Sequence, residues 1–449
     1  MGKLFGTDGV RGVANVEPMT AEIAIAIGRA TAHICKRHRH RHRIVIGKDT
    51  RISGYMLETA LTAGICSMGV DVLLVGPLPT PGIAFITHSM RADAGMVISA
   101  SHNPYQDNGI KIFSRDGYKL PDEVEEEIES LVTTERIRDI RPTAAEIGKA
   151  YRIDDAMGRY IVFCKNTFPE SLTLEGLKIV IDCAHGATYK VAPIIFSELG
   201  AQVITINDRP NGLNINDGCG AMHPDLLVKT VLETRADVGL AFDGDGDRLV
   251  AVDEKGLKLT GDYIVAICAK AMKDCGMLRN NLVVTTPMSN YGFHASMKSL
   301  NIRTELADVG DRYVLKTMKE SGSLLGGEDS GHIIFLHLHT TGDGIISALQ
   351  LLAAMQANEA RLSSLANIIR IVPQRMINVE VCHKPPLATI APLQELIAQA
   401  EAELRDKGRV LVRYSGTQSL CRVMVESVDE ALTHRTAERL AEAVKKYVG

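Results

Sequence analysis

The sequence predicts an α/β protein with three tandem, related α/β domains that contain mixed sheets, followed by a small C-terminal α+β domain. Three times along the chain, an apolar segment typical of a buried strand is followed by a polar loop, a helix and a second strand. These restarts are separated by roughly 100 to 135 residues, which is a weak internal repeat. After residue 375 the order of elements changes. A chain of 449 residues is long enough for three or four domains.

The first domain, residues 1–150, begins with a glycine-rich segment. Its elements are expected to be strands at 43–47, 70–75, 94–98 and 109–113, and helices from residue 20, at 53–68 and at 121–132. A strand, a helix and a second strand at this spacing form a parallel βαβ unit. The periodic pattern weakens between residues 135 and 152, and we place the first domain boundary there.

The remaining three domains are expected at residues 151–253, 254–368 and 369–449. The second should have strands at 177–182, 203–206, 236–242 and 249–253. The third restarts with a strand at 281–286 and has a helix near 310–320. The fourth should have strands at 375–382, 410–413 and 420–426, and helices at 391–407 and from 429.

Composition narrows the class of protein. The formal charge of −4 argues against nucleic acid as a partner. Nine cysteines are scattered without a C-x-x-C pair, which is typical of a reduced cytoplasmic protein. No apolar run approaches the length of a membrane span, and MGKLFGTDG lacks the apolar core of a signal peptide. We therefore expect a cytoplasmic protein that does not interact with membranes.

The loop after the apolar segment 94–98 is a candidate catalytic segment. It reads Ser99-Ala100-Ser101-His102-Asn103-Pro104, so Ser101 should lie at the carboxyl end of a strand. A serine there, with a histidine beside it and Lys111 ten residues further on, could carry a phosphoryl group. An isolated S-x-S-H, however, is more often a serine-rich turn than a catalytic segment.

A second segment favours the phosphoryl hypothesis. Asp243, Asp245 and Asp247 alternate with glycine directly after a predicted strand. Three carboxylates so close together repel one another unless they share a cation, and hard oxygen ligands suit Mg²⁺. A phosphoserine at Ser101 held against that ion would be a phosphoryl donor with its charge neutralised. Arg248, next to the cluster, would then contact phosphate.

Three other interpretations of the aspartate cluster are available. An EF-hand loop requires glycine at its sixth position, where Arg248 stands, and a helix after it, where a strand is predicted. A haloacid-dehalogenase-type phosphatase would use Asp243 as its nucleophile, and this alternative stays open. A purely structural turn would leave the three carboxylates unneutralised.

Three weaker segments could hold a sugar phosphate. Arg11, in the glycine-rich opening TDGVRG, is placed to contact a phosphate. Glu328 and Ser330, in GGEDSGH, offer a carboxylate and a hydroxyl for sugar hydroxyl groups. The last segment offers backbone N–H groups, hydroxyls and guanidiniums that could form an anion nest, and its residues are Arg413, Ser415, Gly416, Thr417 and Arg422. Neither a P-loop nor a G-x-G-x-x-G motif is present, so nucleotide cofactors have no support.

In this order and over the whole chain, TDGVRG, ISASHNP, DGDGDR, GGE-SGH and R-SGT…R resemble the α-D-phosphohexomutase superfamily. FGTDGVRG, GLAFDGDGDR and HTTGDG resemble the bacterial members that act on glucosamine phosphates. The resemblance implies a four-domain, heart-shaped molecule around a central cleft. It also implies interconversion of glucosamine 6-phosphate and glucosamine 1-phosphate, which feeds UDP-N-acetylglucosamine and cell-wall precursor synthesis.

The resemblance also implies a set of cofactors and residue roles. Ser101 would be phosphorylated, and one Mg²⁺ per chain would be bound by Ser101 and the three aspartates. A hexose or hexosamine 1,6-bisphosphate would be the intermediate and activator. The substrate partner would be a small sugar phosphate, and the oligomeric state stays open, with a homodimer as one alternative. The implied contacts are Arg11 and Arg248 to phosphate, Glu328 and Ser330 to the sugar, and Arg413, Ser415, Gly416, Thr417 and Arg422 to the phosphate that does not react.

Several points stay open at the level of sequence. Lys111 or His102 could act as the general acid–base group, and we expect a lysine near arginine and Mg²⁺ to have a lowered pKa, which favours Lys111 slightly. Gln418-Ser419 and Asp329 depart from the residues usual in the superfamily, and we hypothesise that Asp329 favours the ammonium group of the substrate. Two alternative functions also stay open. One is a mutase of the same fold that acts on glucose or mannose phosphates, and the other is a sugar-phosphate sensor without catalytic activity.

Overall fold

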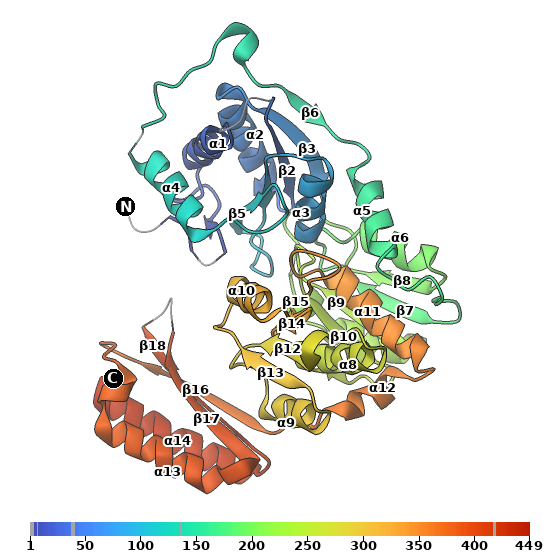
Figure 1. The fold of residues 1–449 in the computed structure, drawn as a ribbon, viewed down its shortest axis with the longest axis vertical. Helices are drawn as coiled ribbons and strands as arrows, with labels where there is room; N and C mark the ends of the chain where they lie inside the picture. The colour runs from blue at the N-terminus through green and yellow to red at the C-terminus, as the bar shows by residue number, and fades with distance from the viewer. Residues whose placement is uncertain (1–3, 7, 37–40, 135, 416–418) are drawn as a thin grey trace.

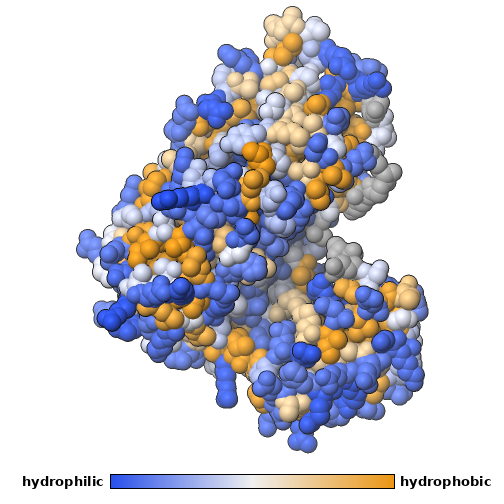
Figure 2. Space-filling view, turned by 180° about the vertical axis from the view of Figure 1, so that it is seen from behind, coloured by the Kyte–Doolittle hydropathy of each residue, from blue (hydrophilic) through white to orange (hydrophobic). Residues whose placement is uncertain are grey.

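The computed structural model describes residues 4–6, 8–36, 41–134, 136–415 and 419–449. Four domains follow one another along the chain, and each contains one sheet. The first domain forms one lobe of the molecule and the C-terminal domain forms another (Figure 1). Figure 2 shows the surface notched between these two lobes. The expected architecture of three α/β domains and a smaller C-terminal domain is confirmed.

The first domain contains a six-stranded mixed sheet in the order β1-β5-β4-β2-β3-β6. β2, β3, β4 and β6 are parallel, whereas β5 runs antiparallel to both β4 and β1. Its strands are β1 (Val10–Val13), β2 (Arg43–Lys48), β3 (Asp71–Pro77), β4 (Ala94–Ile98), β5 (Asp107–Ser114) and β6 (Ala150–Arg152). Its helices are α1 (Ala21–Cys35), α2 (Ser53–Ser67), α3 (Thr80–Ser89) and α4 (Asp122–Thr133). The short strand β6 spans the boundary that we expected at residue 150.

The second domain has a five-stranded sheet in the order β11-β10-β9-β7-β8. The strands are β7 (Lys178–Asp182), β8 (Gln202–Ile206), β9 (Val238–Phe242), β10 (Leu249–Asp253) and β11 (Lys258–Leu259). The helices are α5 (Ala156–Lys165), α6 (Val191–Glu198) and α7 (Asp225–Thr234). β11 pairs with β10, so this sheet extends beyond residue 253, where we expected the domain to end.

The third domain has a four-stranded mixed sheet in the order β13-β12-β14-β15. Its strands are β12 (Leu282–Thr285), β13 (Arg303–Leu306), β14 (Leu325–Gly327) and β15 (Ile333–Phe335). Its helices are α8 (Gly261–Asp274), α9 (Tyr291–Ser299), α10 (Asp311–Ser321), α11 (Gly344–Ala357) and α12 (Leu362–Leu365). α11 begins where the Asp343 carboxylate accepts hydrogen bonds from the N–H groups of Ile345 and Ile346, which are otherwise unpaired at a helix start.

The C-terminal domain has an antiparallel three-stranded sheet in the order β16-β18-β17. Its strands are β16 (Gln374–Glu380), β17 (Gly408–Tyr414) and β18 (Leu420–Ser427), and its helices are α13 (Ala391–Leu404) and α14 (Glu430–Val448). Val423, Val425 and Leu440 belong to a separate apolar core of this domain. One larger core, in contrast, runs through the first three domains. Within the described ranges, no helix is both long and apolar enough to cross a membrane.

Candidate active site

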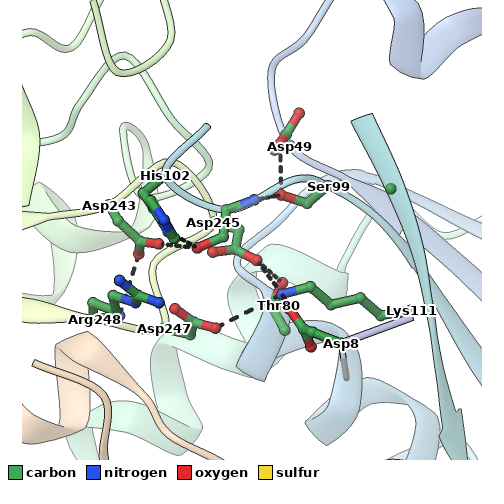
Figure 3. A network of polar contacts seen from close by, with 12 residues as sticks. Asp8, Asp49, Thr80, Ser99, His102, Lys111, Asp243, Asp245, Asp247 and Arg248 are labelled. Carbon is green, nitrogen blue, oxygen red and sulfur yellow. Dashed lines mark hydrogen bonds and ion pairs between the residues drawn. The ribbon is translucent and has the colours of Figure 1, made fainter. Parts of the chain in front are cut away.

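Ser101 lies just beyond the carboxyl end of β4, in the loop that leads to β5. Its side chain is 2% exposed, and its backbone has a positive φ of 51°, which is uncommon for a residue with a Cβ. The hydroxyl donates to Asp243 Oδ2 at 2.6 Å, and its oxygen lies 3.2 Å from His102 Nδ1. Ser101 is therefore presented by the first domain to the aspartate loop of the second. Figure 3 shows His102, the neighbour of Ser101, beside Asp243 of that loop.

Buried polar side chains hold the Ser101 loop in this conformation. The Ser101 N–H donates to Ser99 Oγ at 2.9 Å, and the Ser99 hydroxyl donates to Asp49 Oδ2 at 2.6 Å. Arg51 Nε donates to the same Asp49 oxygen at 2.9 Å. Because Asp49 and Arg51 have fully buried side chains, this pair gives the loop a rigid frame.

The aspartate cluster lies in the loop between β9 and β10. Asp243, Asp245 and Asp247 are all buried, and each offers an oxygen within 4.8 Å of the others. One oxygen of Asp245 and one of Asp247, both Oδ1, are buried without a hydrogen-bond partner. Burial, followed by repulsion from the neighbouring carboxylates, raises the pKa of Asp243 and of Asp247. Three clustered carboxylates, two of which have an oxygen without a hydrogen-bond partner, fit a hard divalent cation such as Mg²⁺.

Lys111 lies on β5 with its ammonium group among carboxylates. Its Nζ is 3.0 Å from Asp245 Oδ2, 3.2 Å from Asp8 Oδ2 and 3.8 Å from Asp247 Oδ2. Burial lowers the pKa of Lys111, but the three carboxylates outweigh this effect, and the pKa lies above its ordinary value. The carboxylates, and not the neighbouring arginine, therefore decide this shift, and the expected lowering, which assumed bound Mg²⁺, stays a prediction.

The pKa of His102 is shifted in the opposite direction from that of Lys111. Burial, followed by the charges of Arg248 and Arg11, lowers the pKa of His102 to about 4. The imidazole is therefore neutral at neutral pH, while Lys111 is charged. The two candidates for proton transfer differ in protonation state, and each is in place for a different role.

A cavity of 190 Å³ opens beside the serine, between the first three domains. Its lining includes five residues predicted from the sequence, namely Arg11, Ser101, Asp247, Arg248 and Glu328. It also includes six that were not predicted, namely Asp8, Gly310, Asp311, Arg312, Tyr313 and His332. Arg11 Nε and Arg248 Nε are buried without a hydrogen-bond partner, which suits them to an anionic ligand.

The unpredicted residues connect the first domain to the third across this cavity. Lys119 contacts both Asp8 and Asp311, and Asp8 also contacts Arg11. His332 Nε2 lies 3.7 Å from Asp311 Oδ2. Asp8 and His332 lie inside motifs already noted, TDGVRG and GGEDSGH, so a polar side chain within a motif was the available signal.

The sugar loop differs from expectation at two positions. Glu328 Oε1 accepts from the Gly310 N–H at 3.0 Å and borders the cavity. Ser330 is exposed and is not part of the cavity lining. The Asp329 carboxylate lies at the first turn of α8, where it accepts from the Asp262 N–H at 3.4 Å and contacts the Thr260 side chain. The Asp329 carboxylate therefore lies at a helix start outside the cavity lining, which argues against the hypothesis that it favours the substrate ammonium.

The C-terminal domain brings two arginines together. Arg413 on β17 and Arg422 on β18 are direct cross-strand partners. Burial, followed by the charge of Arg422, lowers the pKa of Arg413, and Arg422 Nε is buried without a partner. Two adjacent guanidiniums suit an anion such as phosphate. Ser415 is buried at the end of β17, whereas the expected phosphate contacts Gly416 and Thr417 lie outside the described residues.

Comparisons with known proteins identify the same four domains. Four phosphoglucomutase/phosphomannomutase domain families match in chain order: alpha/beta/alpha domain I at residues 2–139, domain II at 159–256, domain III at 260–371 and the C-terminal domain at 376–443. The phosphoglucosamine mutase of Syntrophus aciditrophicus is 59% identical over 449 residues, which cover 100% of both chains. That of Geotalea uraniireducens is 58% identical and covers 100% of this chain and 99% of its own.

Solved structures share the fold. A phosphoglucomutase/phosphomannomutase family protein from Burkholderia thailandensis superposes with a TM-score of 0.81 at 23% identity, covering 100% of this chain and 98% of the other. The N-acetylphosphoglucosamine mutase of Aspergillus fumigatus, solved with GlcNAc-6P and magnesium, has a TM-score of 0.67 at 17% identity, covering 99% and 96%.

Proposed function

This chain belongs to the phosphoglucosamine mutase family of the phosphohexomutases, and from this premise we propose that it interconverts glucosamine 6-phosphate and glucosamine 1-phosphate through a phosphoryl group on Ser101. The observation that carries the proposal is the 2.6 Å contact between the Ser101 hydroxyl and Asp243, beside a cavity with cationic side chains. The full-length identity of 57–59% to curated phosphoglucosamine mutases supports the choice of substrate.

Each half-reaction moves one phosphoryl group in one direction and one proton in the other. The bond between Ser101 Oγ and phosphorus breaks, and a bond forms between phosphorus and a sugar hydroxyl oxygen. That hydroxyl loses its proton, and Ser101 Oγ regains one. The product is a 1,6-bisphosphate, which turns over in the site and returns its other phosphoryl group to Ser101. The same serine oxygen takes part in both halves, so one arrangement of charges serves both.

The residues around Ser101 have distinct tasks in this scheme. Asp243, Asp245 and Asp247 would hold Mg²⁺ together with Ser101, and the ion would neutralise charge on the transferring group. Arg248 and Arg11 steady the phosphoryl oxygens from the cavity wall. Positioning and charge neutralisation are the main sources of rate enhancement in phosphoryl transfer.

His102 and Lys111, the two candidates for proton transfer, have different roles in this scheme. His102 Nδ1 lies 3.2 Å from Ser101 Oγ and is neutral, so it can accept a proton. Lys111 is charged and can donate one, or can hold Asp245 and Asp8 in place as a fixed cation. A pH profile of kcat for His102→Gln and Lys111→Met separates these roles, because only loss of a proton-transfer group removes a limb of the profile.

Residues further from Ser101 hold the rest of the substrate. Glu328 contacts the sugar, and Arg413, Ser415 and Arg422 receive the phosphate that does not react, together with Gly416 and Thr417 from outside the described residues. The notch between the first and C-terminal domains must open for the bisphosphate to turn. We propose a cytoplasmic enzyme that supplies glucosamine 1-phosphate for UDP-N-acetylglucosamine and cell-wall precursors.

Phosphorus NMR tests the reaction directly. Purified protein with Mg²⁺ and a catalytic amount of 1,6-bisphosphate should convert glucosamine 6-phosphate to glucosamine 1-phosphate without releasing inorganic phosphate. Glucose and mannose 6-phosphates, supplied in parallel, should give a much lower kcat/KM. Comparable turnover of the glucose or mannose compounds would favour the broader mutase, and release of inorganic phosphate would favour the phosphatase. If no sugar phosphate were turned over, the result would favour a sugar-phosphate-binding protein without catalytic activity.

A further inference from the structure

The backbone carbonyl groups of the Ser101 loop are held by side chains from two domains. Arg51, from the first domain, donates from Nη2 to the carbonyl oxygens of Ser101 and Asn103, both at 2.9 Å. Asn216, in the loop that follows β8 of the second domain, donates from Nδ2 to the same two oxygens at 2.8 and 3.0 Å. Each carbonyl oxygen therefore accepts one hydrogen bond from each domain, which occupies both of its lone pairs.

Burial and a backbone hydrogen bond hold Asn216 in this position. Its side chain is 9% exposed, and its own N–H donates to the Ala184 carbonyl at 3.0 Å. Its φ is +59°, a left-handed conformation that asparagine adopts more readily than most residues. Gly244 of the aspartate loop packs against the same point, because a Cβ there would lie 2.6 Å from the Ser101 carbonyl oxygen and 2.7 Å from Asn216 Nδ2. The loops that carry Ser101, Asp243 and Asn216 thus meet at a single junction.

We infer that Asn216 is a positioning residue for phosphoryl transfer, which holds the Ser101 loop against the aspartate loop from the side of the second domain. The inference rests on the proposed role of Ser101. Ser101 has a φ of +51°, and a residue with a Cβ keeps such a conformation only where its surroundings fix it. Asn216 is not part of the described cavity lining, so its effect on the reaction is geometric.

Other contacts hold the two domains together when Asn216 is altered. Thr50 Oγ1 donates to the His185 carbonyl at 2.6 Å, and the Ile52 N–H donates to the Gly212 carbonyl at 2.9 Å. The Thr80 N–H donates to the Asp245 carbonyl at 2.9 Å. Loss of the Asn216 amide should therefore displace the serine and leave the fold and the cavity in place. Arg51, in contrast, is fully buried and bonded at every nitrogen, so its removal would test folding instead of positioning.

Two variants of Asn216 test the inference. Asn216→Asp has the same shape but presents an oxygen to the two carbonyl oxygens, which turns attraction into repulsion. Asn216→Gly removes the side chain without adding charge and accepts a positive φ without strain. The matched control is Asn211→Asp, an exposed position in the same loop whose Oδ1 accepts from the Leu213 N–H at 2.9 Å in a bond that aspartate keeps.

The measurement is the single-turnover transfer of phosphate from protein phosphorylated on Ser101 to glucosamine 6-phosphate, together with steady-state kcat and KM. We expect both Asn216 variants to lose about 10- to 100-fold in transfer rate and kcat, since small misplacements of reacting groups have effects of this size. KM and the thermal midpoint should change little, and the control should match the wild type.

The outcomes separate this inference from the proposed function. If the wild type neither carries phosphate on Ser101 nor turns over sugar phosphate, the proposed function is wrong and the inference falls with it. If the wild type behaves as proposed and Asn216→Gly transfers phosphate at the wild-type rate, only the inference is overturned. A lowered thermal midpoint with unchanged kcat would equally overturn it, because Asn216 would then be merely structural.

Discussion

The Ser101 hydroxyl and the Asp243 carboxylate form a 2.6 Å hydrogen bond although 142 residues separate them in the chain. Ser101 follows β4 of the first sheet and Asp243 follows β9 of the second. Each lies at the carboxyl end of a strand, which is where open α/β sheets bind their ligands. The distance between the Ser101 hydroxyl and the Asp243 carboxylate is thus set by how the first two domains pack against each other.

Removing one carboxylate from the aspartate cluster should abolish the response to Mg²⁺. Binding to the folded state alone raises stability by about 2.7 kcal/mol at 100 times the Kd. We therefore expect Mg²⁺ to raise the thermal midpoint of the wild type but not that of Asp247→Asn. Without Mg²⁺ this variant should be at least as stable as the wild type, because burial and repulsion from Asp245 already raise the pKa of Asp247. Asp225→Asn, which neutralises an exposed carboxylate, is the control. Equal stabilisation of both variants by Mg²⁺ would place the ion elsewhere.

Arg312 should link the first and third domains through Glu125. Its Nη2 lies 2.8 Å from Glu125 Oε1, and the Glu125 side chain is only 7% exposed. Its other partner, Asp122, is 65% exposed. We expect a double-mutant cycle of Arg312→Met with Glu125→Gln to give a coupling free energy of about 1–3 kcal/mol, measured by urea unfolding followed by circular dichroism. The cycle with Asp122→Asn should give less than about 1 kcal/mol, because water screens an exposed pair. Equal couplings would contradict this account.

His339 should make stability depend on pH in a defined window. Its Nδ1 accepts from the Thr340 N–H at 2.8 Å and its Nε2 lies 2.9 Å from the Pro81 carbonyl oxygen, which fixes a neutral imidazole. Burial lowers the pKa of His339 to about 4.

Below the unfolded pKa of about 6.5 the unfolded chain binds a proton that the folded chain does not. The contribution of His339 to stability is therefore complete above pH 6.5 and is lost as the pH falls toward 4. The loss amounts to about 1.4 kcal/mol per pH unit within that window. His339→Gln should flatten the fall of the thermal midpoint between pH 6.5 and 4.5, whereas the exposed His223→Gln should not. An unchanged slope in His339→Gln would show that other groups control it.

Asp329 should affect stability and not substrate choice. Its carboxylate accepts from the Asp262 N–H at the start of α8, away from the cavity. Asp329→Asn keeps an acceptor there, so the ratio of kcat/KM for glucosamine and glucose phosphates should stay at its wild-type value. Asp329→Ala should cost about 1 kcal/mol of stability, as expected for loss of a helix cap. A shift of the ratio toward glucose phosphate in Asp329→Asn would restore the specificity hypothesis.

Local patterns were enough to predict the parts of the site that lie within one segment. The apolar strand before Ser101 and the Asp–Gly alternation from Asp243 to Asp247 are short-range signals, and both segments are where the sequence placed them. β6 gave no such signal, because its three residues are exposed and show no apolar alternation. It is a strand only because β3 offers it an edge.

The remaining features of the site depend on packing between domains, which a pattern within one segment of sequence does not encode. Lys119 lies at the site because Asp8 of its own domain and Asp311 of the third domain both contact it. The carboxylates around Lys111 were missed for the same reason, since they come from distant segments. Asp329 and Glu328 are adjacent in sequence, but only Glu328 lines the cavity, and the motif does not encode this difference in side-chain direction.

The central claim is that Ser101 carries the phosphoryl group. Intact mass followed by peptide mapping, before and after incubation with glucosamine 6-phosphate and Mg²⁺, tests it most directly. We predict a mass increment of one phosphoryl group on the peptide that contains Ser101. This increment should disappear after incubation with substrate and should be absent from Ser101→Ala. Phosphate found on Asp243 instead, or on no residue under any condition, would contradict the account.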